Sequence, residues 1–169
     1  MRLPSSVSSI SRSAFATNSD NLEFEIAADN QAFTVKDGVV YNKVLTQVVA
    51  APHRISNYAF PASVTVVGEG AFHLCSHLAE LTIPNGIVTL GQSAFSGCSG
   101  LASITLPDSV TTIGDSAFAD CTALQDFTFS HRVTSVPYMM FYRCHGLETI
   151  TLPENIASIG GYAFCRGVG

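Results

Sequence analysis

A spacing of 23 residues organises most of this sequence. Five phenylalanines stand 23 positions apart, from Phe72 to Phe164, and four cysteines keep the same step, from Cys75 to Cys144. Leucines and glycines recur at further fixed places of the unit: Leu78, Leu101, Leu124 and Leu147, and Gly68, Gly91, Gly114 and Gly160. So many columns at one step are not produced by chance. A repeat of this length is typical of solenoids, in which each unit forms one coil and buries its apolar face against its neighbours.

One part of each unit is expected to form a short strand. Near the end of residues 101–106, apolar and polar residues alternate. This alternation predicts that Ile104 and Leu106 point inward while Ser103 and Thr105 point outward. Stacked coils would place equivalent strands side by side as a parallel sheet, with like residues about 4.8 Å apart. This sheet is the first element that the repeat predicts.

The rest of the unit is expected to return the chain to the next strand. Pro107 ends the strand because it cannot donate to a ladder, and Val110 and Ile113 form a second short apolar pair. The other side of each coil is therefore expected to hold a short strand or 3₁₀ or helical turns. Gly114 then turns the chain. The segment up to Phe118 is expected to start a helical or 3₁₀ turn that buries the phenylalanine ring.

The first 67 residues carry the same pattern with an insertion. Residues 3–15 match 106–118 almost position for position, but Ile26 and the equivalent Phe60 are 34 positions apart, 11 more than one period. The surplus centres on 33–41, where Asp37 and Gly38 stand between β-forming residues. This is a hairpin signal, and we expect a β-hairpin that projects from the second coil. The chain is then one repeat domain with coils 1–26, 27–67, 68–90, 91–113, 114–136, 137–159 and a partial coil, 160–169.

The units resemble the BspA-like leucine-rich repeats, a bacterial and protist class. The resemblance rests on Leu101–Cys121 and on Asp37–Lys43, which is similar to that family's hairpin insertion. It implies a right-handed, mainly β leucine-rich-repeat solenoid, often placed on cell surfaces, that adheres to host matrix proteins or to other cells. It implies no catalytic residues and no cofactor.

Composition excludes several other classes of protein. Apolar residues make up 47% of the chain, charged residues 12%, and the net charge is −5. The chain is too apolar for disorder and too often interrupted by polar residues for membrane insertion, and it lacks the basic stripe that nucleic acid requires. No signal peptide is visible, so the protein is either cytoplasmic or targeted by a segment outside this chain. Both ends fall in mid-unit without a polar cap, so we expect a fragment of a longer array.

The residues with reactive side chains fit structural roles. The four repeated cysteines are expected to be buried free thiols, because stacked coils hold their Cβ atoms parallel and a linear column cannot converge on a metal. Cys165 lies off this column. The histidines nearby are expected to face solvent: His73, His77 and His145. Gly91-Gln-Ser93-Ala is similar to a nucleophile elbow, but it recurs at Gly114, which indicates a repeat turn and not an active site.

Two outward columns form the candidate binding face. One contains Glu80, Ser103, Asp126 and Thr149, and the other contains Thr82, Thr105, Thr128 and Thr151. Exposed sheet faces of repeat proteins often bind partners, although solvation alone also requires polar residues here. An insertion on a repeat scaffold often carries function, so Asp37 and Gly38 join the candidates. We therefore expect a non-enzymatic protein-binding module, with an extracellular matrix or cell-surface protein as partner. An intracellular scaffold with a protein partner is the alternative.

Overall fold

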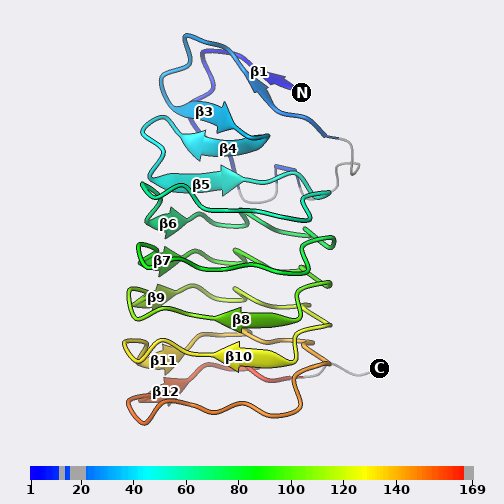
Figure 1. Cartoon of the computed structure of the whole chain (residues 1–169), viewed down its shortest axis with the longest axis vertical. Coiled ribbons are helices and arrows are strands. Elements are labelled where there is room, and N and C mark those ends of the chain that lie inside the picture. The colour runs from blue at the N-terminus through cyan, green and yellow to red at the C-terminus, as the bar shows by residue number, and fades with distance from the viewer. Residues whose placement is uncertain (12–13, 16–21, 166–169) are drawn as a thin grey trace.

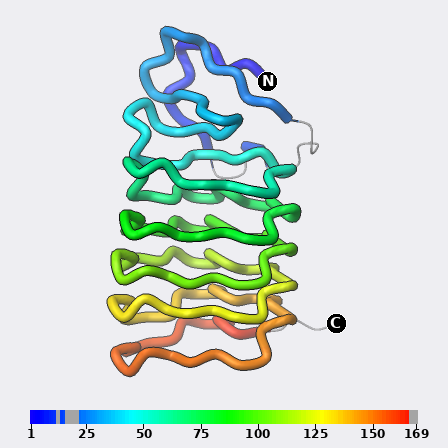
Figure 2. Tube along the Cα trace, in the orientation of Figure 1, coloured from blue at the N-terminus to red at the C-terminus, as the bar shows by residue number. Residues whose placement is uncertain are grey.

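The chain folds as a stack of short coils along one axis (Figures 1 and 2). The computed structural model describes residues 1–11, 14–15 and 22–165. Parts of the first predicted coil and the end of the last, 166–169, lie outside the described residues. A parallel β-solenoid built on the 23-residue unit is confirmed.

The largest sheet has six strands, and we call it the long sheet. Its order is β3 (Phe33–Lys36), β4 (Val39–Asn42), β5 (Gln47–Ala50), β6 (Val66–Val67), β7 (Thr89–Leu90) and β9 (Thr112–Ile113). The first two pairings are antiparallel and the rest are parallel. Three two-stranded parallel sheets complete the described fold: β1 (Arg2–Leu3) with β2 (Glu25–Ile26), β8 (Ser103–Thr105) with β10 (Asp126–Thr128), and β11 (Ser135–Val136) with β12 (Ser158–Ile159).

The repeated coils contribute to the long sheet with their second apolar pair, and not with the segment equivalent to residues 101–106. The strand predicted at 101–106 forms as β8, but among coils 68–159 its only described ladder partner is β10. The longer ladder passes instead through the second apolar pair, with Leu90 opposite Ile113 and Val67 opposite Leu90. The predicted parallel pairing therefore forms between β8 and β10, in the expected register, and the longer parallel ladder lies on the other side of the coils.

Glycines allow the backbones of neighbouring coils to approach closely beside the long sheet. A Cβ on Gly114 would lie 2.4 Å from the backbone nitrogen of Gln92, in the preceding coil, so no other residue fits without displacing that coil. The close approach lets the Gly114 amide donate to the carbonyl of Leu90 at 2.8 Å. Gly91 makes the same bond to Val67 at 2.8 Å. The glycine column therefore fixes the spacing of the long sheet.

Pro137 replaces glycine in one coil and interrupts this ladder. Proline has no amide hydrogen to donate and carries a Cβ where the other coils have none. β11, which precedes Pro137, accordingly pairs with β12 and not with β9. The rings of Phe118 and Phe141 are 6.2 Å apart at this step, compared with 5.3 Å between Phe95 and Phe118. At the same step β8 and β10 pair on the other side of the coils, so the ladder changes sides here.

The β-hairpin forms as predicted, but it does not project. Asp37 and Gly38 have φ of 51° and 78°, and positive φ at both central residues is what a type I′ hairpin turn requires. Val39 and Val40 are fully buried. Figure 1 shows β3 and β4 stacked in line with β5, so the hairpin extends the long sheet by two strands. The tip alone is exposed.

The turns between strands are neither helical nor 3₁₀ in the described residues, contrary to the prediction. The repeated turns instead have left-handed residues at two places, mostly without glycine: Gly70, Ser93, Ser116, Met139 and Tyr162 at the first, and Leu74, Gly97, Asp120 and Arg143 at the second. Amides in this turn donate to the next coil, as Phe95 does to the carbonyl of Ala117 at 2.8 Å. Left-handed positions and coil-to-coil bonds take the place of a helix.

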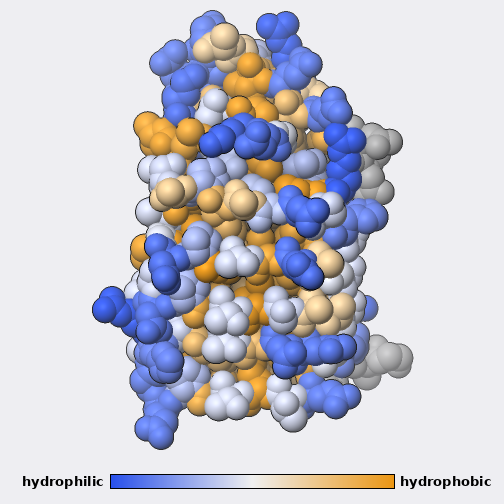
Figure 3. All heavy atoms as spheres, in the orientation of Figure 1, coloured by the Kyte–Doolittle hydropathy of each residue, from blue (hydrophilic) through white to orange (hydrophobic). Residues whose placement is uncertain are grey.

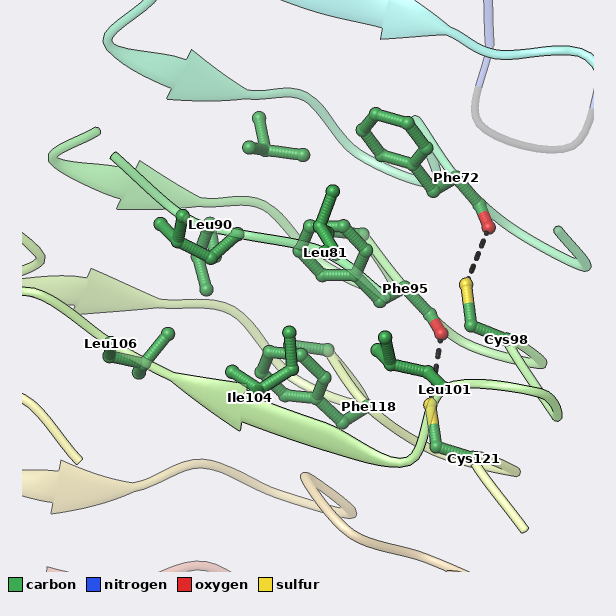
Figure 4. Packing of buried hydrophobic residues seen from close by; sticks show 14 of the residues in the cluster. Phe72, Leu81, Leu90, Phe95, Cys98, Leu101, Ile104, Leu106, Phe118 and Cys121 are labelled. Carbon is green, nitrogen blue, oxygen red and sulfur yellow. Dashed lines mark hydrogen bonds between the residues drawn. The ribbon is translucent and has the colours of Figure 1, made fainter. Parts of the chain in front are cut away.

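The core is a column of stacked rings beside a column of thiols (Figure 4). Phe72 and Phe95 stack at 5.2 Å with 15° between their planes, and both are fully buried. The four repeated cysteines are buried and free, as predicted. Burial raises the pKa of Cys75 and of Cys144 to about 12. Of the three histidines expected to face solvent, His77 and His145 are exposed, whereas His73 is half-buried.

Candidate binding surface

The two outward columns lie on one face of the stack, which we call the threonine face. All eight predicted residues are exposed: Glu80, Thr82, Ser103, Thr105, Asp126, Thr128, Thr149 and Thr151. In β8 and β10 the exposed residues pair in register, with Asp126 opposite Ser103 and Thr128 opposite Thr105. Asn57 and Ala59 stand one period earlier and extend the columns, although they were not among the predicted residues. Figure 3 shows weakly polar side chains in upright columns over the lower coils.

Apolar side chains form the floor between the columns. Leu81, Ile104 and Phe127 alternate with the outward residues and are buried. Figure 3 shows apolar atoms between the polar columns. In the coil of β10 the floor is aromatic, because the ring of Phe127 packs edge-on against Phe118 at 5.1 Å and against Phe141 at 4.8 Å. A partner on this face would therefore meet rows of hydroxyls and carboxylates over a rigid apolar base.

Two hollows open on the threonine face, each at a step where neighbouring coils form no ladder on this side. One hollow of about 330 Å³ lies between β10 and residues 149–153, and Asp126, Thr128, Thr149 and Thr151 contribute to its lining. Another, of about 340 Å³, lies between residues 57–59 and 80–82. Strands hold neighbouring coils about 4.8 Å apart, and neither of these two steps has a strand pair on this face. The absence of a ladder leaves room for side chains of a partner.

The carboxylates of this face have no positive partner in the described part of the chain. The ion pairs there join Arg54 to Glu23, His131 to Asp108 and Arg143 to Asp120. Neither Glu80 nor Asp126 belongs to any of them. Both side chains are exposed, and the net charge of the chain is −5, so the face favours positive groups at short range.

The hairpin tip joins this surface at one end. A third hollow, of about 450 Å³, is lined by Asp37, Gly38, Tyr41, Pro52 and residues 54–59. It shares residues 57–59 with the hollow beside Glu80. The structure thus brings Asp37 and Glu80 into adjoining hollows, whereas Asp126 and its neighbours line a separate one. Tyr41 and Tyr58 were not among the site residues predicted from the sequence. Tyr58 carried a signal, because it places a hydroxyl group in the inward column that contains Leu81 and Ile104 in later coils.

Comparison with known proteins identifies the repeat. A model of the BspA type leucine rich repeat region matches residues 46–167 in six copies. The chain belongs to this family. No curated protein matches the sequence.

Solved structures of bacterial leucine-rich repeat proteins share the fold. A leucine-rich repeat protein from Eubacterium ventriosum ATCC 27560 matches with a TM-score of 0.81 and 27% identity, over 97% of this chain and 51% of that one. A leucine rich cell surface protein from Faecalibacterium prausnitzii A2-165 matches with a TM-score of 0.57 and 30% identity, over 85% of this chain and 33% of that one. The pneumococcal vaccine antigen PcpA, at 20% identity and a TM-score of 0.61 over 96% of this chain and 42% of its own, shows the fold alone. The chain spans about half or less of these three structures.

The BspA-type repeat also accounts for the residues that could suggest other chemistry. Ser93 and Ser116, the serines of the elbow-like motif, occupy equivalent left-handed turn positions with φ of 53° and 56°. Across the described residues, no group of three or more histidines, cysteines or acidic residues is placed to hold a metal ion. The same residues contain no helix long and apolar enough to cross a membrane.

Proposed function

We propose that this chain is a non-enzymatic protein-binding module that works at the cell surface, in adhesion or in contact with host or matrix proteins. The observation that supports it most is the threonine face, where exposed columns and hollows lie over a rigid, ladder-bonded core. Pre-organised surfaces of this kind bind with little loss of conformational entropy. The Faecalibacterium relative, which is described as a cell surface protein and is 30% identical, supports the location.

The chemistry of the face limits the kind of partner. Glu80 and Asp126 supply unpaired carboxylates, and Thr82, Thr105, Thr128 and Thr151 supply a row of hydroxyls. Positive or hydroxyl-rich protein surfaces would form charge-assisted hydrogen bonds here. The hollow beside β10 adds an apolar wall from Phe127 and Phe129 that suits an aliphatic or aromatic side chain. Because the carboxylates are exposed, binding should weaken as salt increases.

Charge reversal on the threonine face tests the proposal. The protein would first be screened against matrix and cell-surface proteins to find a partner. Glu80→Lys and Asp126→Lys would then be compared with Glu69→Lys, which reverses an exposed charge in the turn after β6. Asp115 is a poorer control because its Oδ1 accepts a bond from the Tyr138 amide. We expect the two face variants to lose most of the affinity, with unchanged melting temperatures.

The opposite results are equally clear. Equal affinity of all three variants would show that the threonine face is not the binding surface. Staining of intact and permeabilised cells with an antibody against the chain separates a surface location from an intracellular one. A signal seen after permeabilisation alone would favour the intracellular scaffold.

A further inference from the structure

Two tyrosine hydroxyls meet in the hollow at the hairpin tip. The hydroxyl oxygens of Tyr41 and Tyr58 are 2.8 Å apart, so one hydroxyl donates to the other. A mutual bond uses one of the two protons, and the second proton and the remaining lone pairs are left for another partner. Tyr41 is 1% exposed and Tyr58 is half-buried, and both line the hollow. A buried polar pair with unused capacity beside an open hollow is what a binding site requires.

The hollow is negative. Asp37 stands in its wall, and Glu80 lines the hollow that adjoins it. Arg54 also contributes to the wall, but its guanidinium is 2.9 Å from the carboxylate of Glu23, which balances its charge. Asp37 and Glu80 therefore remain as unbalanced charges around the tyrosine pair.

The negative charge of Asp37 also affects the pKa of both tyrosines. Burial raises the pKa of Tyr41 most, and the charge of Asp37 adds to the increase. Burial likewise raises the pKa of Tyr58, followed by its bond to Tyr41 and the charge of Asp37. Both side chains stay neutral, and the charge of Asp37, which opposes a negative oxygen here, would favour a positive group in the same place.

We propose that this hollow receives an arginine side chain of the partner protein, with its guanidinium between Asp37 and the tyrosine hydroxyls. The inference rests on the proposed protein-binding function and names the group that the hairpin end of the surface recognises. A planar guanidinium offers several donors in fixed directions, which suits a carboxylate beside hydroxyl acceptors, and it stacks on aromatic rings such as Tyr58. Pro52 and residues 54–59 also line the hollow, and Asn57 adds an amide there.

A titration with a small probe tests the site without the partner. N-acetyl-arginine methylamide would be added to the chain and followed by NMR, with the corresponding citrulline compound, which has the same shape without the charge. We expect saturable shifts of the Tyr58 ring and Asn57 amide signals with the arginine probe alone. Asp37→Asn should weaken binding about tenfold, because it removes a charge-assisted bond. Tyr41→Phe should weaken it less, and Glu69→Gln, which changes an exposed residue outside the lining of the hollow, should leave binding unchanged.

Several outcomes would overturn the inference. Equal shifts with arginine and citrulline, or undiminished binding by a folded Asp37→Asn variant, would show that no cation is recognised. Shifts produced by a methyl glycoside and not by arginine would assign the hollow to a carbohydrate.

Failure of the arginine site can also be distinguished from failure of the proposed binding function. Suppose that a partner protein loses affinity for Asp126→Lys but binds Asp37→Asn as tightly as the unmodified chain. The threonine face would then stand as the binding surface, and the arginine site would be refuted. Arginine binding at the tip in a chain whose face variants bind the partner normally would instead support the arginine site and refute the threonine face.

Discussion

The thiol of Cys98 donates a hydrogen bond of 3.1 Å to the carbonyl oxygen of Phe72, one coil earlier in the stack. Cys121 makes the same bond to Phe95 at 3.2 Å, and Cys144 to Phe118 at 3.0 Å. A small side chain that can be buried and can still donate suits this position better than alanine or serine would. The cysteine column thus satisfies carbonyl groups of the phenylalanine column.

The buried thiols should resist modification. A thiol reacts as its thiolate, which burial disfavours, so Cys98 and Cys121 should react slowly in the folded protein and rapidly in denaturant. Mass spectrometry after timed alkylation at pH 8 measures the number of labelled thiols. A native disulfide between any two column cysteines, seen as a loss of two hydrogens in the intact mass, would contradict the column geometry.

Stability should fall at alkaline pH. The pKa of Cys75 and of Cys144 is about 12 in the folded chain, against 9.0 ordinarily, so the unfolded chain releases these protons first. The stabilisation is complete below about pH 9 and is lost as the pH rises toward 12. Urea denaturation under reducing conditions at pH 8, 9, 10 and 11 checks this. Cys75→Ala should show a shallower decline, and a midpoint constant across this range would refute the prediction.

Removing one ring from the phenylalanine column should be costly. Phe118 is fully buried and stacks against Phe95 and Phe141. Phe118→Ala should reduce the free energy of unfolding by roughly 3–5 kcal/mol, because large-to-small changes lose burial and leave a cavity. Chemical denaturation measures it. A loss under about 1 kcal/mol would mean that neighbouring coils close the gap without penalty.

Adding a single carbon to the glycine column should separate two coils. Gly114→Ala places a Cβ against the backbone of Gln92, which cannot move without opening the long sheet. We expect a loss of about 1–3 kcal/mol, as for other overpacked sites. Gly86→Ala is the matched control, since its Cβ would meet nothing closer than the Val64 carbonyl oxygen at 3.8 Å. Equal melting temperatures of the two variants would argue against a steric role for the column.

Replacing Pro137 by glycine should let the long sheet continue from β9 to β11. Pro137→Gly supplies an amide that can donate to the carbonyl of Ile113, as the Gly114 amide does to Leu90. Stability should change by less than about 1 kcal/mol, because the new bond offsets the entropic benefit of proline. Hydrogen exchange should show a protected amide at residue 137. The Leu106 amide, which donates to Thr128 at 2.9 Å, should exchange faster as β8 and β10 separate. Unchanged exchange at Leu106 would mean that the two ladders are independent.

Side-chain columns could be predicted from the sequence because burial repeats with the period. The stacked phenylalanines, the buried thiols and the eight exposed residues of the threonine face all follow from counting in steps of 23. Asp37-Gly38 likewise predicted a hairpin turn from its backbone requirement alone. The run Val39-Val40-Tyr41 carried a further signal, because consecutive buried apolar residues are covered on both faces and so belong inside a sheet.

Backbone pairing was harder to predict because both short segments of the unit have strand-like alternation. Their difference lies in the residue that follows. In the repeated coils, β6, β7 and β9 of the long sheet are each followed by a glycine, which admits the neighbouring backbone. The segment predicted as the strand is instead followed by Pro84, Pro107 and Pro153, which lack an amide donor. The turns were missed for a related reason: left-handed residues such as Ser116 and Arg143 have no distinctive sequence. The hollows depend on which coils pair, so they could not be inferred before the pairing was known.

Pro137 also bears on how a partner would recognise the threonine face. Because β8 and β10 pair at the step where the glycine ladder is interrupted, the residue that follows one strand sets the spacing of side chains on another. A proline in place of Gly91 would interrupt the glycine ladder two coils earlier. Strands on the threonine face would then pair between those earlier coils, nearer the hairpin, and would hold their outward residues in register there. The epitope of such an array is therefore encoded partly by residues that a ligand never touches, and two chains with identical exposed columns would present them at different intervals.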